Sequence, residues 1–108
     1  MMKNKRVVIG TVGAGYAAEL HAAGYKKVYG IDVRLKTVCD VRLDAAEKIK
    51  NKYDYENAVT DYVEMLMDPE VNVIDIVTPP FLHCEMAILA MNAGKHVICE
   101  KPLTGYFG

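Results

Sequence analysis

An apolar run near the start of the chain passes directly into a glycine-rich turn. Residues 6–12 read Arg-Val-Val-Ile-Gly-Thr-Val, and residues 13–18 read Gly-Ala-Gly-Tyr-Ala-Ala. This Gly-x-Gly-x-x-Ala spacing is typical of a strand, a tight turn and a helix that bind the diphosphate of a dinucleotide. Glycine lets the backbone approach a diphosphate because no Cβ intervenes, and the following helix offers unpaired N–H groups and partial positive charge. The motif predicts a site for an anionic cofactor.

An acidic and a basic residue follow the next predicted strand, which covers residues 33–40. Asp40 ends that strand, where a carboxylate can accept hydrogen bonds from an adenosine ribose and repel a 2′-phosphate. By its type alone, Asp40 would instead be interpreted as a turn or helix-cap residue. Arg42 leaves the choice of cofactor open, because its guanidinium can pair with a 2′-phosphate, stack on adenine or stay in solvent. We therefore expect NAD and leave NADP open.

A Thr-Pro-Pro sequence follows the most continuously apolar predicted strand, residues 71–77. Ligands of open α/β sheets bind at the carboxyl ends of the strands, so we expect Thr78, Pro79 and Pro80 at the binding crevice. The prolines make this wall rigid, and Pro80 suits the first turn of the next helix. His83 lies in that turn, either as an exposed polar residue or as a contact of the cofactor.

Glu100 and Lys101 come at the end of a fifth predicted strand, residues 96–100, on the same edge as the glycine turn. Lys101 can hydrogen-bond a ribose hydroxyl or a substrate oxygen, and its charge can stabilise negative charge that develops during hydride transfer. The alternative is a surface ion pair between Glu100 and Lys101, which would contribute little to stability. These two residues by themselves leave both interpretations open.

Apolar runs alternate with helical patterns along the chain, which predicts strand–helix–strand units and a parallel sheet. The remaining predicted elements are a strand over 58–60 and helices over 14–24, 43–52, 61–67 and 81–93. Gly24 and Gly94 are expected to end the first and last helices, and Asp61 with Glu64 resembles a capping box. We predict a doubly wound, mainly parallel α/β sheet of about five strands in the order 3-2-1-4-5. Asp75, in the most apolar strand, needs a polar partner if it is buried.

Length and composition describe one ordinary folded domain. The chain has 108 residues, of which 52% are hydrophobic and 25% charged, and a formal net charge of −1. This balance gives no basic field for nucleic acid or an anionic membrane, and no apolar run has the length of a membrane span. We expect no nucleic-acid or membrane partner and a cytoplasmic location. Cys39, Cys84 and Cys99 form no C-x-x-C pair, so we expect reduced, packed thiols and no metal site.

These motifs together resemble the glucose–fructose oxidoreductase, inositol dehydrogenase and MocA family. The resemblance covers the whole chain and rests on the glycine turn, His21, Cys39-Asp40, residues 73–83 and residues 93–103. It implies that residues 1–108 are an NAD(P)-binding Rossmann domain, which in the family is followed by a larger α/β domain absent from this sequence. Family members oxidise or reduce sugars, polyols and related hydroxyl compounds with NAD or NADP.

The resemblance also implies a role for each matching position. The diphosphate would be lined by Gly13, Gly15, Tyr16 and Ala17, with Asp40 on the adenosine ribose. The cofactor would be flanked by Thr78, Pro79, Pro80 and His83, with Glu100 and Lys101 at its nicotinamide half. Lys101 is the one catalytic residue of the family present here. His21 we interpret as structural, and Ala18 in place of a third glycine still permits close helix packing.

The sequence therefore predicts the dinucleotide-binding domain of an oxidoreductase that acts on the CH–OH group of a sugar-like or polyol substrate. The family's catalytic Asp and His belong to the absent domain, so we expect this chain to bind cofactor without turnover and to form a homo-oligomer. Two alternatives stay open. One is a non-catalytic module that senses NAD or NADP, and the other is an α/β fold whose glycines serve turns alone.

Overall fold

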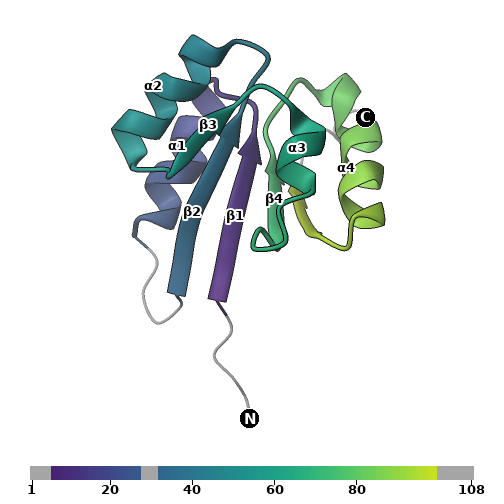
Figure 1. Ribbon diagram of the computed structural model, residues 1–108. Helices are drawn as coiled ribbons and strands as arrows, with labels where there is room; N and C mark the ends of the chain where they lie inside the picture. The colour runs from purple at the N-terminus through teal and green to yellow at the C-terminus, as the bar shows by residue number, and fades with distance from the viewer. Residues whose placement is uncertain (1–5, 28–31, 100–108) are drawn as a thin grey trace.

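The chain forms a five-stranded sheet flanked by helices in the computed structural model, which describes residues 6–27 and 32–99 (Figure 1). The strands are β1 (Arg6–Val12), β2 (Asp32–Cys39), β3 (Asn57–Val59), β4 (Val73–Ile76) and β5 (His96–Cys99). The helices are α1 (Tyr16–Tyr25), α2 (Leu43–Tyr53), α3 (Tyr62–Leu66) and α4 (His83–Asn92), with a 3-10 turn η1 (Pro80–Leu82) before α4. The sheet order is β3-β2-β1-β4-β5 and every pairing is parallel, which confirms the predicted fold class and strand order.

The order of the strands reverses at β1. The chain runs from β1 to β2 and β3 on one side, and then returns to β4 and β5 on the other. In doubly wound sheets, ligands bind outside the carboxyl ends of the strands at such a reversal. The turn that leaves β1, which carries the glycine motif, therefore lies where a binding crevice is expected.

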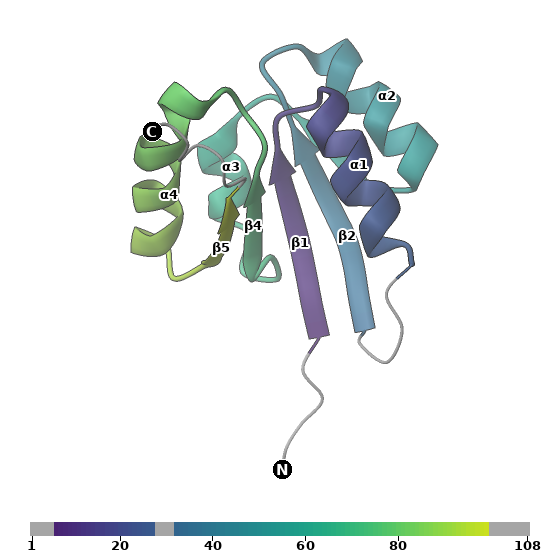
Figure 2. The same ribbon diagram turned by 180° about the vertical axis from the view of Figure 1, so that it is seen from behind.

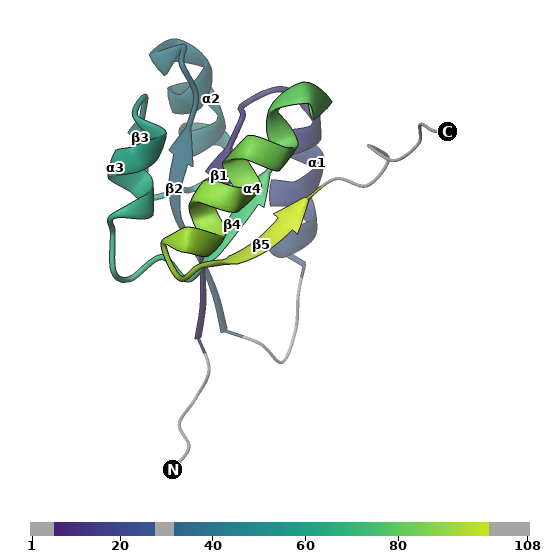
Figure 3. The same cartoon turned by 90° about the vertical axis from the view of Figure 1, so that its right-hand side faces the viewer.

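Side chains alternate along β1 and divide the core into two layers. Val8 and Val12 belong to the cluster that includes Leu66 of α3 and Ala90 of α4, whereas Ile9 packs with residues of α1 and α2. Figure 1 and Figure 2 show α3 and α4 on one face of the sheet and α1 with α2 on the other. Figure 3 looks onto the β5 edge, with α1 and α3 on opposite sides of the sheet.

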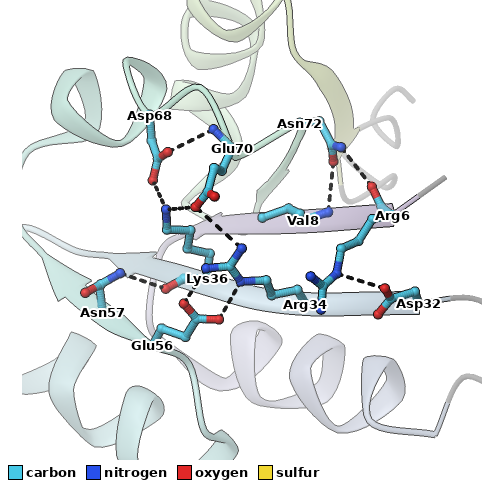
Figure 4. A network of polar contacts seen from close by, with 10 residues as sticks. All are labelled: Arg6, Val8, Asp32, Arg34, Lys36, Glu56, Asn57, Asp68, Glu70 and Asn72. Carbon is cyan, nitrogen blue, oxygen red and sulfur yellow. Dashed lines mark hydrogen bonds and ion pairs between the residues drawn. The ribbon is translucent and has the colours of Figure 1, made fainter. Parts of the chain in front are cut away.

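The first residues of β1 extend beyond β4, because pairing between these strands begins only at Ile9 and Val73. Asn72 fills the gap with its side chain (Figure 4). Its Oδ1 accepts the N–H of Val8 at 2.9 Å, and its Nδ2 donates to the carbonyl of Arg6 at 2.9 Å. The side-chain amide of Asn72 thus pairs with the part of β1 that lies beyond the start of β4, and extends the hydrogen bonding of the sheet there.

A network of ion pairs covers the amino-terminal half of β2 (Figure 4). The guanidinium of Arg34 donates two hydrogen bonds to the carboxylate of Glu56, at 2.6 and 2.7 Å. The Nζ of Lys36 lies 2.8 Å from a carboxylate oxygen of Asp68 and 2.6 Å from one of Glu70. The helix on this face, α3, has five residues and is too short to cover the full length of β2. Charged side chains therefore cover part of the strand that a longer helix would otherwise bury.

The helix ends differ in part from the sequence prediction. Gly24, expected in a left-handed cap, lies inside α1, which continues to Tyr25. Gly94 has φ +81° just after α4, as predicted. Asp61 caps α3 as predicted, because its side chain accepts the N–H groups of Val63 and Glu64. The last predicted helix begins as η1 and becomes α-helical only at His83.

Alanine substitutions at the two glycines distinguish these environments. Gly24→Ala should raise the free energy of unfolding by about 0.5–1 kcal/mol, since alanine is the better helix former and its Cβ meets no atom within 4 Å. Gly94→Ala should lower it by about 1 kcal/mol, because an L side chain is strained at φ +81°. Urea denaturation followed by circular dichroism measures both, and a shift of the same sign in both variants would contradict the assignment.

Candidate functional site

A pocket of about 610 Å³ opens at the carboxyl ends of β1, β2 and β4. Its walls come from the glycine turn, residues 39–41, the start of α3 and the segment that follows β4. Small-molecule sites in proteins have volumes of roughly 300–1,000 Å³, so the pocket is large enough for part of a dinucleotide. The strand reversal and the pocket therefore coincide, as the fold predicts.

Gly13 occupies the tightest point of the turn. Its N–H donates to the carbonyl of Cys39 at 2.8 Å, and its φ is +107°. A Cβ at this position would lie 2.8 Å from the carbonyl oxygen of Val77. No side chain can be placed there without moving the backbone after β4, so the fold itself requires glycine at position 13.

Gly15 has a different environment. Its φ of −96° and ψ of −157° suit any residue, and no atom lies within 4 Å of the position that its Cβ would take. Neither backbone strain nor a crowded neighbour explains a glycine here. The open space beside Gly15 lies directly at the start of α1, where a ligand could approach the backbone only if no side chain were present.

The first turn of α1 presents N–H groups toward this space. The N–H groups of Ala18 and Glu19 donate to the carbonyl of Gly15, at 3.1 and 3.3 Å. No described residue accepts the N–H groups of Gly15, Tyr16 or Ala17, as is usual for the start of a helix. These donors and the positive end of the helix dipole favour an anion such as a diphosphate.

Asp40 joins the glycine turn to the loop after β2. One carboxylate oxygen accepts the N–H of Ala14 at 2.8 Å, and the other accepts the N–H of Arg42 at 2.9 Å. A carboxylate has about four acceptor positions, so these two bonds leave room for two further donors. Asp40 lines the pocket while it holds the glycine turn, an arrangement that suits the hydroxyls of a ribose.

Arg42 lies outside the main pocket. Its guanidinium is exposed and lies 3.3 Å from Asp44, a surface pair of little energetic weight. Together with Lys48, Arg42 lines a second hollow on the other side of Gly15. Two basic side chains therefore flank the glycine turn on the side away from the main pocket.

The Thr-Pro-Pro segment divides between the pocket and the structure behind it. Thr78 and Pro79 line the pocket, whereas Pro80 and His83 do not. His83 is buried, and its Nε2–H donates to the carbonyl of Thr78 at 2.6 Å. Its Nδ1 has no hydrogen-bond partner in the described part of the chain. The structure thus places His83 behind the segment that it supports, away from the pocket surface.

Sequence reasoning missed the apolar side of the pocket, which is formed by Val41, Thr60, Tyr62, Leu82 and Met86. Val41 is 88% exposed although it is aliphatic, and it directly follows Asp40. Thr60 was within reach of the sequence, because it follows β3 and strand ends share one edge. Tyr62, Leu82 and Met86 belong to the α3 and α4 regions, and only the packing of those helices brings them to the pocket.

The three cysteines differ, which corrects the prediction that all are packed. Cys39 is buried at the pocket, but Cys84 and Cys99 are exposed. Burial raises the pKa of the Cys39 thiol to about 11, and the charge of Asp40 acts in the same direction. Burial likewise raises the pKa of Tyr62, at the same pocket, to about 12. Both groups therefore stay protonated at neutral pH.

Two predicted site residues, Glu100 and Lys101, lie outside the described residues. Within residues 6–27 and 32–99, no cluster of three His, Cys, Asp or Glu side chains is placed to hold a metal ion. Among the helices described, none has both the length and the apolar character needed to cross a membrane.

The sequence matches the model of a family described as an oxidoreductase family with an NAD-binding Rossmann fold, over residues 6–106. Levoglucosan dehydrogenase of Pseudarthrobacter phenanthrenivorans is 34% identical, with 88% of this chain and 26% of that protein aligned. Myo-inositol 2-dehydrogenase of Thermotoga maritima is 35% identical over 89% of this chain and 28% of that protein. The chain therefore spans little more than a quarter of the length of these two relatives.

Solved structures show the same likeness in three dimensions. A complex of levoglucosan dehydrogenase with NADH superposes with a TM-score of 0.85 and 31% identity, covering 92% of this chain and 28% of that one. Scyllo-inositol dehydrogenase of Lactobacillus casei with bound NAD(H) and scyllo-inositol gives a TM-score of 0.80 and 29% identity, covering 92% of this chain and 29% of that one.

The thiols should differ in their reaction with iodoacetamide. At pH 8, Cys39 should be alkylated roughly 100-fold more slowly than Cys84, because only the thiolate reacts and a pKa of about 11 leaves little thiolate. Its rate should rise with pH up to about pH 11. Mass spectrometry of the native chain after timed labelling measures both rates. Equal labelling of Cys39 and Cys84 at pH 8 would contradict the buried position of Cys39.

Proposed function

The chain belongs to the oxidoreductase family with an NAD-binding Rossmann fold, and from this membership we propose that it binds NAD(H) as the cofactor domain of a dehydrogenase. The observation that carries the proposal is the open space at Gly15, the N-cap of α1, where no atom lies within 4 Å of the position that a Cβ would take. The substrate class proposed for the longer protein is a sugar-like or polyol compound, since relatives are named as levoglucosan and inositol dehydrogenases.

The site fits each part of the cofactor. The diphosphate would lie against the first turn of α1 beside Gly15, Tyr16 and Ala17. The hydroxyls of the adenosine ribose would bond to Asp40, and the apolar side of the pocket that includes Val41 would take the adenine. The nicotinamide half would extend past Thr78 and Pro79, with Pro80 and His83 supporting that wall from outside the pocket.

The charges around the ribose favour NAD over NADP. The carboxylate of Asp40 would lie beside the 2′ position and repel a phosphate there. Arg42 and Lys48, in the adjoining hollow, are the groups that could offset this repulsion. We therefore take NAD as the preferred cofactor, and the comparison of NADH with NADPH tests this preference directly.

Bound NAD supplies an acceptor for the hydride that leaves the carbinol carbon, while the hydroxyl proton passes to a base. In this proposal Lys101 hydrogen-bonds the reacting oxygen and stabilises the negative charge that develops there, with Glu100 next to it. The base and the substrate pocket would come from polypeptide beyond this sequence, so the chain by itself would bind cofactor without turnover. This agrees with its coverage of little more than a quarter of its relatives.

We extend the proposal to a cytoplasmic location and to self-association of the longer protein. The exposed apolar side chains Ile88, Met91 and Ile98, on α4 and the edge strand β5, support an association through this side of the domain.

Gly15→Val tests the proposal. The substituted chain should fold, because the backbone angles are ordinary and the side chain meets no atom, but NADH should bind at least about tenfold more weakly. Calorimetric titration measures the Kd, and thermal unfolding checks the fold. Gly24→Ala, in α1 but away from the turn, is the matched control and should keep the affinity of the original chain. Undiminished binding by Gly15→Val, or no binding of NADH by the original chain, would overturn the proposal.

Asp40→Asn tests the preference for NAD. An asparagine oxygen can still accept the N–H of Ala14 and so hold the glycine turn, although the bond to the N–H of Arg42 is lost. The charge that repels a 2′-phosphate is removed. The ratio of the Kd for NADPH to the Kd for NADH should fall about fivefold, since one repulsion between solvent-exposed charges contributes on the order of 1 kcal/mol. An unchanged ratio would remove Asp40 from its proposed place at the ribose.

A further inference from the structure

A fully buried carboxylate in β4 receives two side chains from α1. Asp75 has no exposed surface, and its oxygens accept the Nδ1–H of His21 at 2.8 and 3.0 Å. The hydroxyl of Tyr25 donates to the same carboxylate at 2.6 Å. Burial and the neighbouring carboxylate raise the pKa of Tyr25 far above its usual value, so the phenol stays a donor. The polar partners that the sequence demanded for Asp75 are therefore His21 and Tyr25.

The buried side chains of α1 contribute contacts with little direction. Its buried side chains are Ala18 and Ala22, both with no exposed surface. Alanine methyl groups set the distance between a helix and a sheet, but they do not fix the position of the helix along its axis. Hydrogen bonds do, because they weaken steeply when the donor moves away from its acceptor. His21 and Tyr25, one turn apart, give α1 two such bonds to a single point on β4.

The strand that holds Asp75 also meets the glycine turn. The N–H of Val77 donates to the carbonyl of Val12 at 2.9 Å, and the carbonyl of Val77 is the atom that excludes a side chain at Gly13. The backbone at the end of β4 therefore contacts the turn that leads into α1, and Asp75, two residues earlier, holds the second half of α1. The open donors of the first turn lie between these two attachments.

We propose that the cluster of Asp75, His21 and Tyr25 fixes the position of α1 relative to β4. In this position the N–H groups of the first turn of α1 point toward the cofactor diphosphate. These three are positioning residues, because none of them lines the pocket. The inference rests on the proposed function for its affinity measurement, but the position of α1 can also be tested without cofactor. A cluster that merely stabilised the core would lower the melting temperature and leave the affinity of the folded chain unchanged.

Tyr25→Phe is the cleanest variant, since it removes the hydroxyl and keeps the ring. Its matched control is Tyr53→Phe in α2. This change removes a hydroxyl that donates to Glu19 of α1 at 3.1 Å and makes no bond to the sheet. Calorimetric titration with NADH, well below the melting temperature of every variant, should give an approximately tenfold higher Kd for Tyr25→Phe, or about 1.4 kcal/mol. Tyr53→Phe should stay within about twofold of the original chain. Equal Kd values for Tyr25→Phe and the original chain would overturn the inference.

His21 provides a rescue experiment. In His21→Asn the amide nitrogen can take the place of Nδ1 and still donate to Asp75, whereas His21→Ala removes the donor. The alanine variant should bind NADH more weakly by about tenfold, and the asparagine variant should recover most of the affinity. An equal loss of NADH affinity in both variants would show that the bond from residue 21 to Asp75 does not determine this affinity.

Hydrogen exchange separates failure of this inference from failure of the proposed function. In the cofactor-free chain, Tyr25→Phe should speed the exchange of α1 amides about tenfold relative to those of α2, as followed by NMR. Absence of NADH binding by the original chain would overturn the proposed function, and α1 exchange would still decide the role of the cluster. Unchanged exchange of α1 amides in Tyr25→Phe would overturn the positioning role.

Discussion

The rest of the site depends on one constraint, the close passage of the chain at Gly13 between Cys39, at the end of β2, and Val77, just after β4. Gly13 donates to the carbonyl of Cys39 on one side and has no room for a Cβ beside Val77 on the other. This close approach joins both halves of the sheet at the point where the strand order reverses. It also determines where α1 begins, and so where unpaired helix donors face the pocket.

The two glycines of the motif therefore serve different purposes. Gly13 is required by the protein's own backbone, whereas Gly15 leaves free space that the protein does not use. Asp40 combines both purposes in one side chain, because it holds Ala14 of the turn and still faces the pocket. The same contacts that make the loop rigid thus leave it prepared for a ligand, which reduces the ordering that binding would require.

Much of this architecture follows from local patterns in the sequence. The alternation of apolar runs with helical patterns predicted the parallel sheet, the doubly wound fold class supplied the strand order, and the rule that ligands bind at strand ends brought Gly15, Asp40 and Thr78 to one edge. What local patterns did not show depends on packing between distant segments. Gly24 was expected to end a helix that in fact continues through it, because the type of residue does not reveal its φ. Asp75 needed a partner, but only the packing of α1 against the sheet identifies His21 and Tyr25.

The side chain of Asn72 bears on whether a strand of another molecule can add to the sheet beside β1. The overhanging start of β1 would otherwise present unpaired backbone groups beside β4, and such edges are templates on which a strand of another molecule can add. By pairing with the N–H of Val8 and the carbonyl of Arg6, Asn72 occupies two of the backbone groups to which an incoming strand could bond. One amide side chain thus makes the addition of a foreign strand less favourable at this overhang of β1.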